Sequence, residues 1–202
     1  MNLIIFGGFL GSGKTSLILS LARYLVDKEK AEKPELVIIE NEVGEVGIDD
    51  KVLETGGFEV KELFAGCVCC TLSASLTLTV RQVKENLDPK WVIIEATGLA
   101  YPENILSTIL RHNREIIDKA LIVTVVDAQR WEEFYAATPL LIQYQVEDGH
   151  VILLNKIDLV TPEEQKAVAE QVAKINPKAP IYPVSANKID ATLWEKVVAH
   201  HE

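Results

Sequence analysis

The chain has 202 residues, 48% of them hydrophobic and 25% charged, a composition that excludes a mainly disordered protein. Its 30 acidic and 20 basic residues give a net charge of −10, which disfavours general binding to nucleic acid or anionic membranes, because each phosphate contact needs a cation. The sequence predicts no targeting segment and no membrane span, since no apolar run approaches the roughly 18 residues that a bilayer requires.

Short apolar runs rich in β-branched residues alternate with amphipathic stretches, as is typical of a parallel sheet covered by helices on both faces. Strands are predicted over residues 3–6, 36–39, 91–94, 121–126, 151–154 and 181–184. Helices are predicted over residues 15–28, 72–86, 102–113, 162–175 and 191–200. The last strand is expected at an edge, because Pro183 cannot donate to a ladder. The alternation predicts a single α/β domain with three layers and a mostly parallel central sheet.

The first predicted strand runs into a glycine-rich segment, GFLGSGKT at 8–15, that matches G-x-x-x-x-G-K-[ST] in full. Glycines let the backbone curl until successive N–H groups point at phosphate oxygens, and the positive end of the next helix adds to that field. Lys14 would reach the β- and γ-phosphates, and the Thr15 hydroxyl would ligate Mg²⁺. The motif predicts a P-loop NTPase domain over residues 1–202. Its predicted nucleotide-binding residues are Gly8, Gly11, Ser12, Gly13, Lys14, Thr15 and Ser16.

Two later loops predict which base is bound. An N-K-x-D element at 155–158 follows a predicted strand directly. The Asp158 carboxylate can accept both N1–H and the exocyclic N2–H of guanine, whereas adenine would leave it unpaired. Residues 185–187 follow the last predicted strand, where a second loop that contacts guanine is expected. GTP and GDP are therefore the predicted ligands, held at the base by Asn155, Lys156, Asp158, Ser185, Ala186 and Asn187.

An E-x-x-G element, Glu95 to Gly98, follows the predicted strand 91–94. A carboxylate there can hold Mg²⁺ through water, and the Gly98 N–H can contact the γ-phosphate, so both residues are predicted to act in catalysis with Lys14 and Thr15. Leu99 comes next, and no glutamine stands there to orient the attacking water. The sequence therefore predicts slow intrinsic hydrolysis, which suits a switch.

Together these motifs resemble the CobW-like GTPases, the metallochaperone branch of P-loop GTPases that also includes the urease and hydrogenase accessory GTPases. The resemblance covers nearly the whole chain and rests on segments 7–15, 40–49, 66–70, 95–102 and 155–158. The C-x-C-C motif within 66–70 is its most family-specific element. The resemblance implies that a metal bound at this motif is coupled to the nucleotide state.

Cys67, Cys69 and Cys70 are the three cysteines of the chain, and they fall between the first two predicted helices. Neighbouring cysteines make strained disulfides, so three adjacent thiols suit a soft cation, with Zn²⁺ favoured. A fourth ligand must come from elsewhere, and Glu40 and Glu45 are candidates. The alternative interpretations are small core residues for the cysteines and surface acids for the glutamates. This cysteine usage also favours a reducing compartment, so a cytoplasmic protein is expected.

The resemblance also implies roles for two aspartates. Segment 40–49 would be the first switch loop, in which Asp49 approaches Mg²⁺ in the GTP state. Asp127 stands at a family position after the strand 121–126, although a helix cap explains it equally well. CobW-like proteins usually carry a second, C-terminal domain, whereas a GTPase domain alone is expected for this chain. Gly149 and the histidine after it replace the Ala-Asp common in the family.

These expectations combine into a GTP-hydrolysing, Mg²⁺-dependent metallochaperone that delivers zinc or another transition metal to an unidentified client metalloprotein. Analogy with relatives suggests a homodimer in the GTP state. Three alternatives stay open: a GTPase that assists cofactor insertion and has structural cysteines, a P-loop kinase of a small molecule, and a GTP-binding scaffold. A kinase would need an arginine-rich lid, for which Arg111, Arg114 and Arg130 are the available residues.

Overall fold

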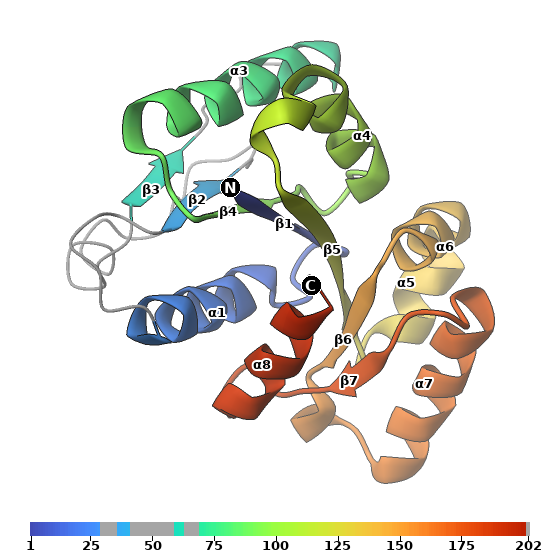
Figure 1. Ribbon diagram of the computed structural model, residues 1–202. Helices are drawn as coiled ribbons and strands as arrows, with labels where there is room; N and C mark the ends of the chain where they lie inside the picture. The colour runs from blue at the N-terminus through green and yellow to red at the C-terminus, as the bar shows by residue number, and fades with distance from the viewer. Residues whose placement is uncertain (29–35, 41–58, 63–68, 201–202) are drawn as a thin grey trace.

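The computed structural model describes residues 1–28, 36–40, 59–62 and 69–200, of which 59–62 and 69–75 are described by their backbone. Within these ranges seven strands form one parallel sheet in the order β3-β2-β4-β1-β5-β6-β7 (Figure 1). The strands are β1 Asn2–Gly7, β2 Leu36–Glu40, β3 Glu59–Glu62, β4 Trp91–Glu95, β5 Lys119–Asp127, β6 Val151–Asn155 and β7 Ile181–Pro183. The helices are α1 Lys14–Lys28, α3 Cys69–Leu87, α4 Pro102–Asn113, α5 Trp131–Ala137, α6 Pro139–Glu147, α7 Pro162–Ile175 and α8 Ala191–Ala199, with 3₁₀ turns η1 Arg114–Ile116 and η2 Ile157–Leu159.

The α/β fold with a parallel sheet is confirmed, and all six predicted strands are present. Pro183 ends β7, which lies at the edge of the sheet beyond β6, as expected. Sequence reasoning missed β3, whose EVKE sequence has one apolar residue. β3 is the strand at the opposite edge, and charged residues are common on edge strands because they discourage pairing with another chain.

All five predicted helices occur, but two helices between β5 and β6 were not predicted. α5 and α6 have 7 and 9 residues, and Thr138 alone separates them. Proline at the start of α6 is a helix-start signal that could have revealed it. The second predicted helix is also longer than expected, since α3 begins at Cys69 instead of at residue 72. Cys69 and Cys70 therefore stand in the first turn of α3, not in the loop before it.

Helices cover both faces of the sheet (Figure 1), and the described residues form three hydrophobic clusters, one on one face and two on the other. On one face, Leu21 of α1 and Trp194 of α8 pack on strand residues such as Phe6. The Trp194 indole N–H donates to the Ser20 hydroxyl at 3.0 Å, which ties α8 to α1. The other face is covered in two parts: α3 and α4 lie over β2, β4 and β1, and α5, α6 and α7 lie over β5 and β6. The three-layer arrangement is therefore present in the described part of the chain.

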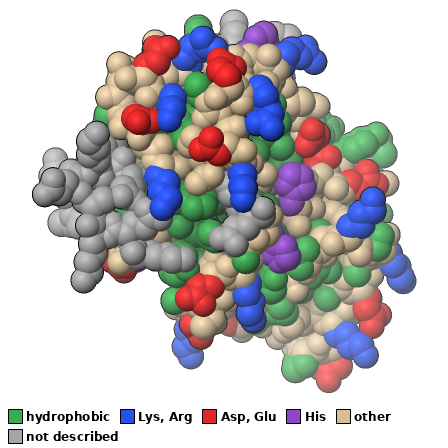
Figure 2. Space-filling view, in the orientation of Figure 1, with side chains coloured by type: hydrophobic (Ala, Val, Ile, Leu, Met, Phe, Trp, Pro, Cys, Tyr) green, Lys and Arg blue, Asp and Glu red, His purple; other side chains and the backbone are tan. Residues whose placement is uncertain are grey.

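The described surface carries side chains of both charges. On the face shown in Figure 2, acidic and basic side chains of the described residues are interspersed and do not gather into one basic patch. No described helix combines the length and the apolar character that crossing a membrane requires.

Two leucines of α3 test how this helix contributes to stability. Leu76 is 4% exposed in the core beneath the helix, whereas Leu78 is 62% exposed. Leu76→Ala is expected to lower the free energy of unfolding by about 2–5 kcal/mol, because it removes buried methyl groups and leaves a cavity. Leu78→Ala, the matched control, should stay within about 0.5 kcal/mol of the parent. Urea unfolding followed by circular dichroism measures both, and equal losses would contradict the placement of α3.

Candidate functional site

The loops that follow β1, β4, β5 and β6 meet at the end of the sheet that the carboxyl ends of the strands form. The register pairs Phe6 with Glu95 and Asp127 with Asn155, so these strands end at the same level. Ligands of open α/β sheets bind beyond the carboxyl ends of the strands. The segments predicted to bind the phosphates, magnesium and the base are thus brought together at the end of the sheet where a ligand is expected.

The segment 8–15 has a backbone that only glycine can adopt at its key positions. Gly8, Gly11 and Gly13 have φ values of 130°, 71° and 97°, in the left-handed region that disfavours other residues. A Cβ on Gly8 would lie 2.2 Å from the Val125 carbonyl oxygen, and one on Gly13 would lie 2.3 Å from the Asn155 amide nitrogen. The segment therefore forms a tight loop that is enclosed by neighbouring strands.

Two side chains of this loop fit the binding of phosphate. Ser12 is fully buried, and its hydroxyl has no hydrogen-bond partner among the described residues. Because a buried hydroxyl without a partner costs free energy, this atom fits a site completed by a polar ligand. The Lys14 ammonium curls back over the loop and donates to the carbonyl oxygens of Gly8 at 3.0 Å and Phe9 at 3.3 Å. A cation is thus held at the loop, next to the N-terminus of α1. Ser16, in the same turn, is exposed.

Thr15 and Glu95 form the second element of the site. The Thr15 hydroxyl lies 2.9 and 3.0 Å from the two carboxylate oxygens of Glu95, which is 7% exposed. Hydroxyl and carboxylate oxygens are the ligands that Mg²⁺ prefers. This pair, drawn from two elements 80 residues apart, therefore fits a magnesium ion between them.

Gly98 lies against the phosphate loop. A Cβ on Gly98 would approach the backbone nitrogen of Leu10 to 2.5 Å and its Cα to 2.9 Å, so only glycine allows this contact. The Ala100 N–H donates to the Thr97 carbonyl at 3.0 Å and closes a turn around Gly98. The E-x-x-G element is therefore packed on the segment that would hold the phosphates.

Asn155 joins the phosphate loop to the loop at 185–187. Its amide nitrogen donates to the Ser12 carbonyl at 2.8 Å, and its amide oxygen accepts from the Ala186 N–H at 3.0 Å. Asn155 is 1% exposed, so both bonds are sheltered from water. Ser185 accepts from the Lys188 N–H at 2.8 Å, which turns this loop back on itself and leaves Asn187 exposed.

Lys156 and Asp127 form an ion pair beside Asn155, with the ammonium 2.7 Å from a carboxylate oxygen. The other oxygen of Asp127 accepts from the N–H groups of Gln129 and Arg130, just before α5. Asp127 therefore closes a turn before α5 and pairs with the N-K-x-D element, whereas the N-cap position of α5 is occupied by Arg130, without a side-chain cap. The Asp158 carboxylate belongs to an exposed residue in η2, open to a ligand.

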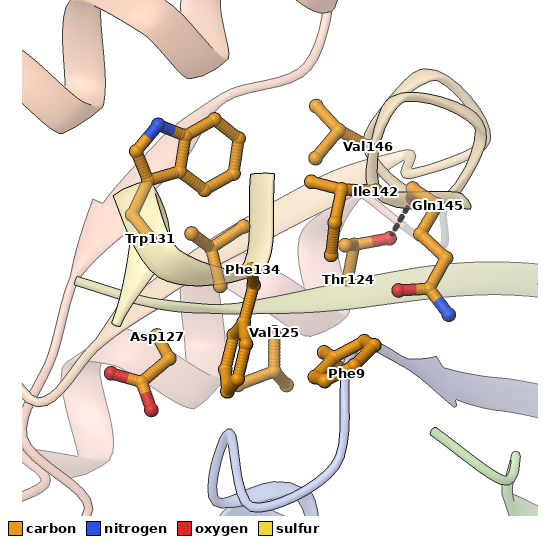
Figure 3. A pocket seen from close by; sticks show the side chains of 10 residues that line it. Phe9, Thr124, Val125, Asp127, Trp131, Phe134, Ile142, Gln145 and Val146 are labelled. Atoms are coloured by element: carbon orange, nitrogen blue, oxygen red, sulfur yellow. Dashed lines mark hydrogen bonds between the residues drawn. The ribbon is translucent and has the colours of Figure 1, made fainter. Parts of the chain in front are cut away.

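A pocket lies beside the phosphate loop, between Phe9, Phe134 and Gln145 (Figure 3). Phe9 and Phe134 are in ring contact, with centroids 4.3 Å apart. The Arg130 guanidinium lies 4.1 Å from the Phe134 ring centroid and donates to both carboxylate oxygens of Glu133. These hydrogen bonds hold the pKa of Glu133 below its usual range. The loop at Phe9 is thus supported by α5, a helix that the sequence did not reveal.

The predicted transition-metal ligands are only partly described. Glu40 ends β2, is 7% exposed, and is the register partner of Glu95. Cys69 and Cys70 open α3 and are placed by their backbone, whereas Cys67, Glu45 and Asp49 lie outside the described residues. In the described ranges no group of three or more His, Cys, Asp or Glu side chains could hold a metal ion.

Comparisons with known proteins show which family and which fold the chain resembles. Residues 2–183 match the family model described as "CobW/HypB/UreG, nucleotide-binding domain". The chain is 33% identical over 195 residues to "Zinc chaperone YjiA" of Escherichia coli, covering 92% of this chain and 58% of that protein. It is 29% identical over 214 residues to "Zinc-regulated GTPase metalloprotein activator 1" of Dictyostelium discoideum, covering 87% of this chain and 44% of that protein. The chain thus spans about half the length of these relatives.

Solved structures show the same fold. The structure of "Zn(II)-bound YjiA GTPase from E. coli" superposes with a TM-score of 0.62 at 26% identity, covering 96% of this chain and 60% of that one. HypB from Helicobacter pylori in complex with nickel gives a TM-score of 0.58 at 16% identity, which shows likeness of fold alone.

The two hydrogen bonds by which Asn155 bridges the phosphate loop and the loop at 185–187, here called the Asn155 bridge, can be tested by one isosteric change. Asn155→Asp would turn the donor towards Ser12 into a carboxylate oxygen that faces a carbonyl at 2.8 Å. We expect the free energy of unfolding to fall by roughly 1–3 kcal/mol, because a buried polar contact becomes repulsive. Asn187→Asp makes the same chemical change at an exposed position and should leave stability unchanged. Thermal unfolding of the two variants at pH 7 decides, and an unaltered Asn155→Asp protein would refute the bridge.

Proposed function

Because the chain belongs to the CobW/HypB/UreG family of nucleotide-binding domains, we propose that it is a Mg²⁺-dependent GTPase that couples its nucleotide to the binding and delivery of a transition metal, zinc first. One observation carries the proposal: the Thr15–Glu95 pair, which fits magnesium, lies in register with Glu40, a candidate metal ligand. Register partners point to the same face of a sheet, so Glu40 and Glu95 are close neighbours. A change of charge or of bound cation at one carboxylate would therefore alter the electrostatic energy of the other.

The residues of the phosphate loop would hold the triphosphate. Backbone N–H groups from Gly8 to Thr15 cradle the phosphates, and Lys14 exchanges its carbonyl acceptors for β- and γ-phosphate oxygens. Magnesium would be held by Thr15 and by Glu95, the latter through water, and would supply charge neutralisation at the phosphates. We also propose Asp49 as a residue that approaches this ion in the GTP state.

Hydrolysis in this site is proposed to be slow. Gly98 would present its N–H to the γ-phosphate and stabilise charge that develops there. The next residue, Leu99, is 60% exposed and carries no group that could orient water. A GTPase of this kind keeps its bound nucleotide long enough to act as a switch.

The metal site proposed for the cargo consists of Cys67, Cys69 and Cys70, with Glu40 or Glu45 as the fourth ligand. Thiolates with one carboxylate suit Zn²⁺ in tetrahedral coordination. Support comes from relatives named as zinc chaperones and from the zinc-bound structure of one of them. Two of the three cysteines open α3, so a metal held there would link this helix to the end of β2.

The remaining parts of the function concern partners and place of action. We propose that the metal is delivered to a client metalloprotein, that GTP favours a homodimer, and that the protein acts in the cytoplasm. One relative is named "Zinc-regulated GTPase metalloprotein activator 1", which supports the first of these. Order–disorder of loops on GTP hydrolysis is the general device by which such delivery could be timed.

The choice of base is tested at Asp158. Asp158→Asn should weaken GTP binding roughly 10- to 100-fold, because two hydrogen bonds from guanine to a carboxylate are lost. Xanthosine triphosphate should bind more tightly than to the parent, since its C2 carbonyl can accept from the new amide. Asp190→Asn is the matched control, because Asp190 is an exposed N-cap of α8 and asparagine caps equally well. Fluorescent-nucleotide titration that showed an unchanged preference would remove the guanine assignment.

The metal site is tested by Cys67→Ser/Cys69→Ser/Cys70→Ser. Zinc affinity should fall by more than about 100-fold, since even the outer partners of a metal site change affinity 10- to 100-fold. In the parent, zinc affinity should differ by about fivefold or more between GDP and a non-hydrolysable GTP analogue with Mg²⁺, as coupling requires. Chelator competition on reduced protein measures both values. GDP binding by the triple variant serves as the control for folding, and parent-like zinc affinity in that variant would disprove the site.

A further inference from the structure

Gln145 uses its buried side chain to hold the loop that contains Gly98. The side-chain amide nitrogen donates to the carbonyl oxygens of Gly98 at 3.0 Å and Ala100 at 2.9 Å. The residue is 2% exposed, so water does not compete for these bonds. A primary amide has two N–H groups, and each has an acceptor in the same turn. The amide therefore fixes the carbonyl groups of the two residues on either side of Leu99.

The helix that carries Gln145 is itself anchored to the sheet. The Thr124 hydroxyl of β5 donates to the Gln145 carbonyl at 2.7 Å, the bond drawn in Figure 3. The Asn176 amide donates to the Val146 carbonyl at 2.8 Å and ties the end of α6 to the segment after α7. Tyr144, one residue before Gln145, meets Tyr101 edge to face at 5.7 Å between centroids. The Gln145 amide is thus a fixed point against which the loop is held.

The fixed loop is the one that packs on the phosphate segment. Gly98 approaches Leu10 so closely that a Cβ would lie 2.5 Å from its backbone nitrogen. The peptide that follows Gly98 is oriented by Gln145, and the turn from Thr97 to Ala100 fixes the peptide that precedes it. The position of the Gly98 N–H relative to the phosphate loop therefore depends on α6.

From this geometry we propose that Gln145 is a positioning residue for recognition of the γ-phosphate. It does not touch the nucleotide. By holding Gly98 against Leu10, it places the Gly98 N–H where the γ-phosphate of GTP would lie and where GDP has no group. This inference rests on the proposed GTP site and deepens it, because it assigns the preference for GTP over GDP to a helix behind the loop. An anchor of purely structural use would affect both nucleotides equally.

The test compares two glutamines of α6. Gln145→Met keeps the side-chain length and removes both donors, whereas Gln143→Met removes an amide that donates to Glu147 on the same helix. Affinities for GDP and for a non-hydrolysable GTP analogue, each with Mg²⁺, are measured by titration calorimetry. For Gln145→Met we expect the preference for the analogue over GDP to fall about tenfold, in the range of typical coupling between sites, while GDP affinity stays as in the parent. Gln143→Met should match the parent in both affinities.

The deciding quantity is the affinity for the GTP analogue divided by the affinity for GDP. The inference is overturned if Gln145→Met leaves this ratio unchanged or if Gln143→Met lowers it equally. If Gln145→Met does not fold, the same two affinities are measured for Thr124→Val. This change removes the hydrogen bond from the Thr124 hydroxyl to the Gln145 carbonyl, which anchors α6, without changing side-chain shape. Its ratio should fall in the same direction, and an unchanged ratio would again overturn the inference. A parent protein that binds neither nucleotide would overturn the proposed function itself. Normal nucleotide binding by the parent with an unchanged ratio in the variants would overturn the role of Gln145 alone.

Discussion

The hydrogen bonds of the Asn155 amide are the interaction on which the rest of the site depends. One buried side chain connects the phosphate loop, through the Ser12 carbonyl, to the loop at 185–187, through the Ala186 N–H. The same amide explains why Gly13 must lack a side chain, because any Cβ would occupy its place. The loops proposed to bind the base and the phosphates are therefore tied together at the carboxyl ends of β1 and β6. Lys156 and Asp127 extend this connection towards α5.

Sequence reasoning predicted the parts of the molecule that local chemistry determines. The glycines at 8–15 could be predicted because the backbone there excludes other residues, and five of the six predicted strands because both of their faces are apolar. β3 was missed since an edge strand needs no apolar pattern, and α5 and α6 were missed since short helices give weak periodicity. The role of Gln145 could not be predicted either, because its partners lie 45 and 47 residues away and only the fold brings them near.

Two carboxylates side by side constrain how the proposed switch could work. Glu40 and Glu95 end adjacent strands in register, and both are nearly buried. Buried like charges raise each other's energy unless cations or hydrogen-bond donors compensate them. The Thr15 hydroxyl contributes such a donor at Glu95. A divalent ion near either carboxylate would change the electrostatic energy of the other, which provides a direct physical link between nucleotide and metal without a long pathway.

The folded-back position of Lys14 has a consequence for nucleotide turnover. Its ammonium already has acceptors in the carbonyl groups of Gly8 and Phe9, so the side chain has lost much of its conformational freedom before any phosphate arrives. Binding then becomes an exchange of partners, in which phosphate oxygens replace carbonyl oxygens around the same cation. Release runs the exchange backwards and leaves no buried charge without a partner. The loop therefore lowers the free-energy cost of the empty site at its own lysine, which would suit the nucleotide exchange that the proposed delivery cycle requires.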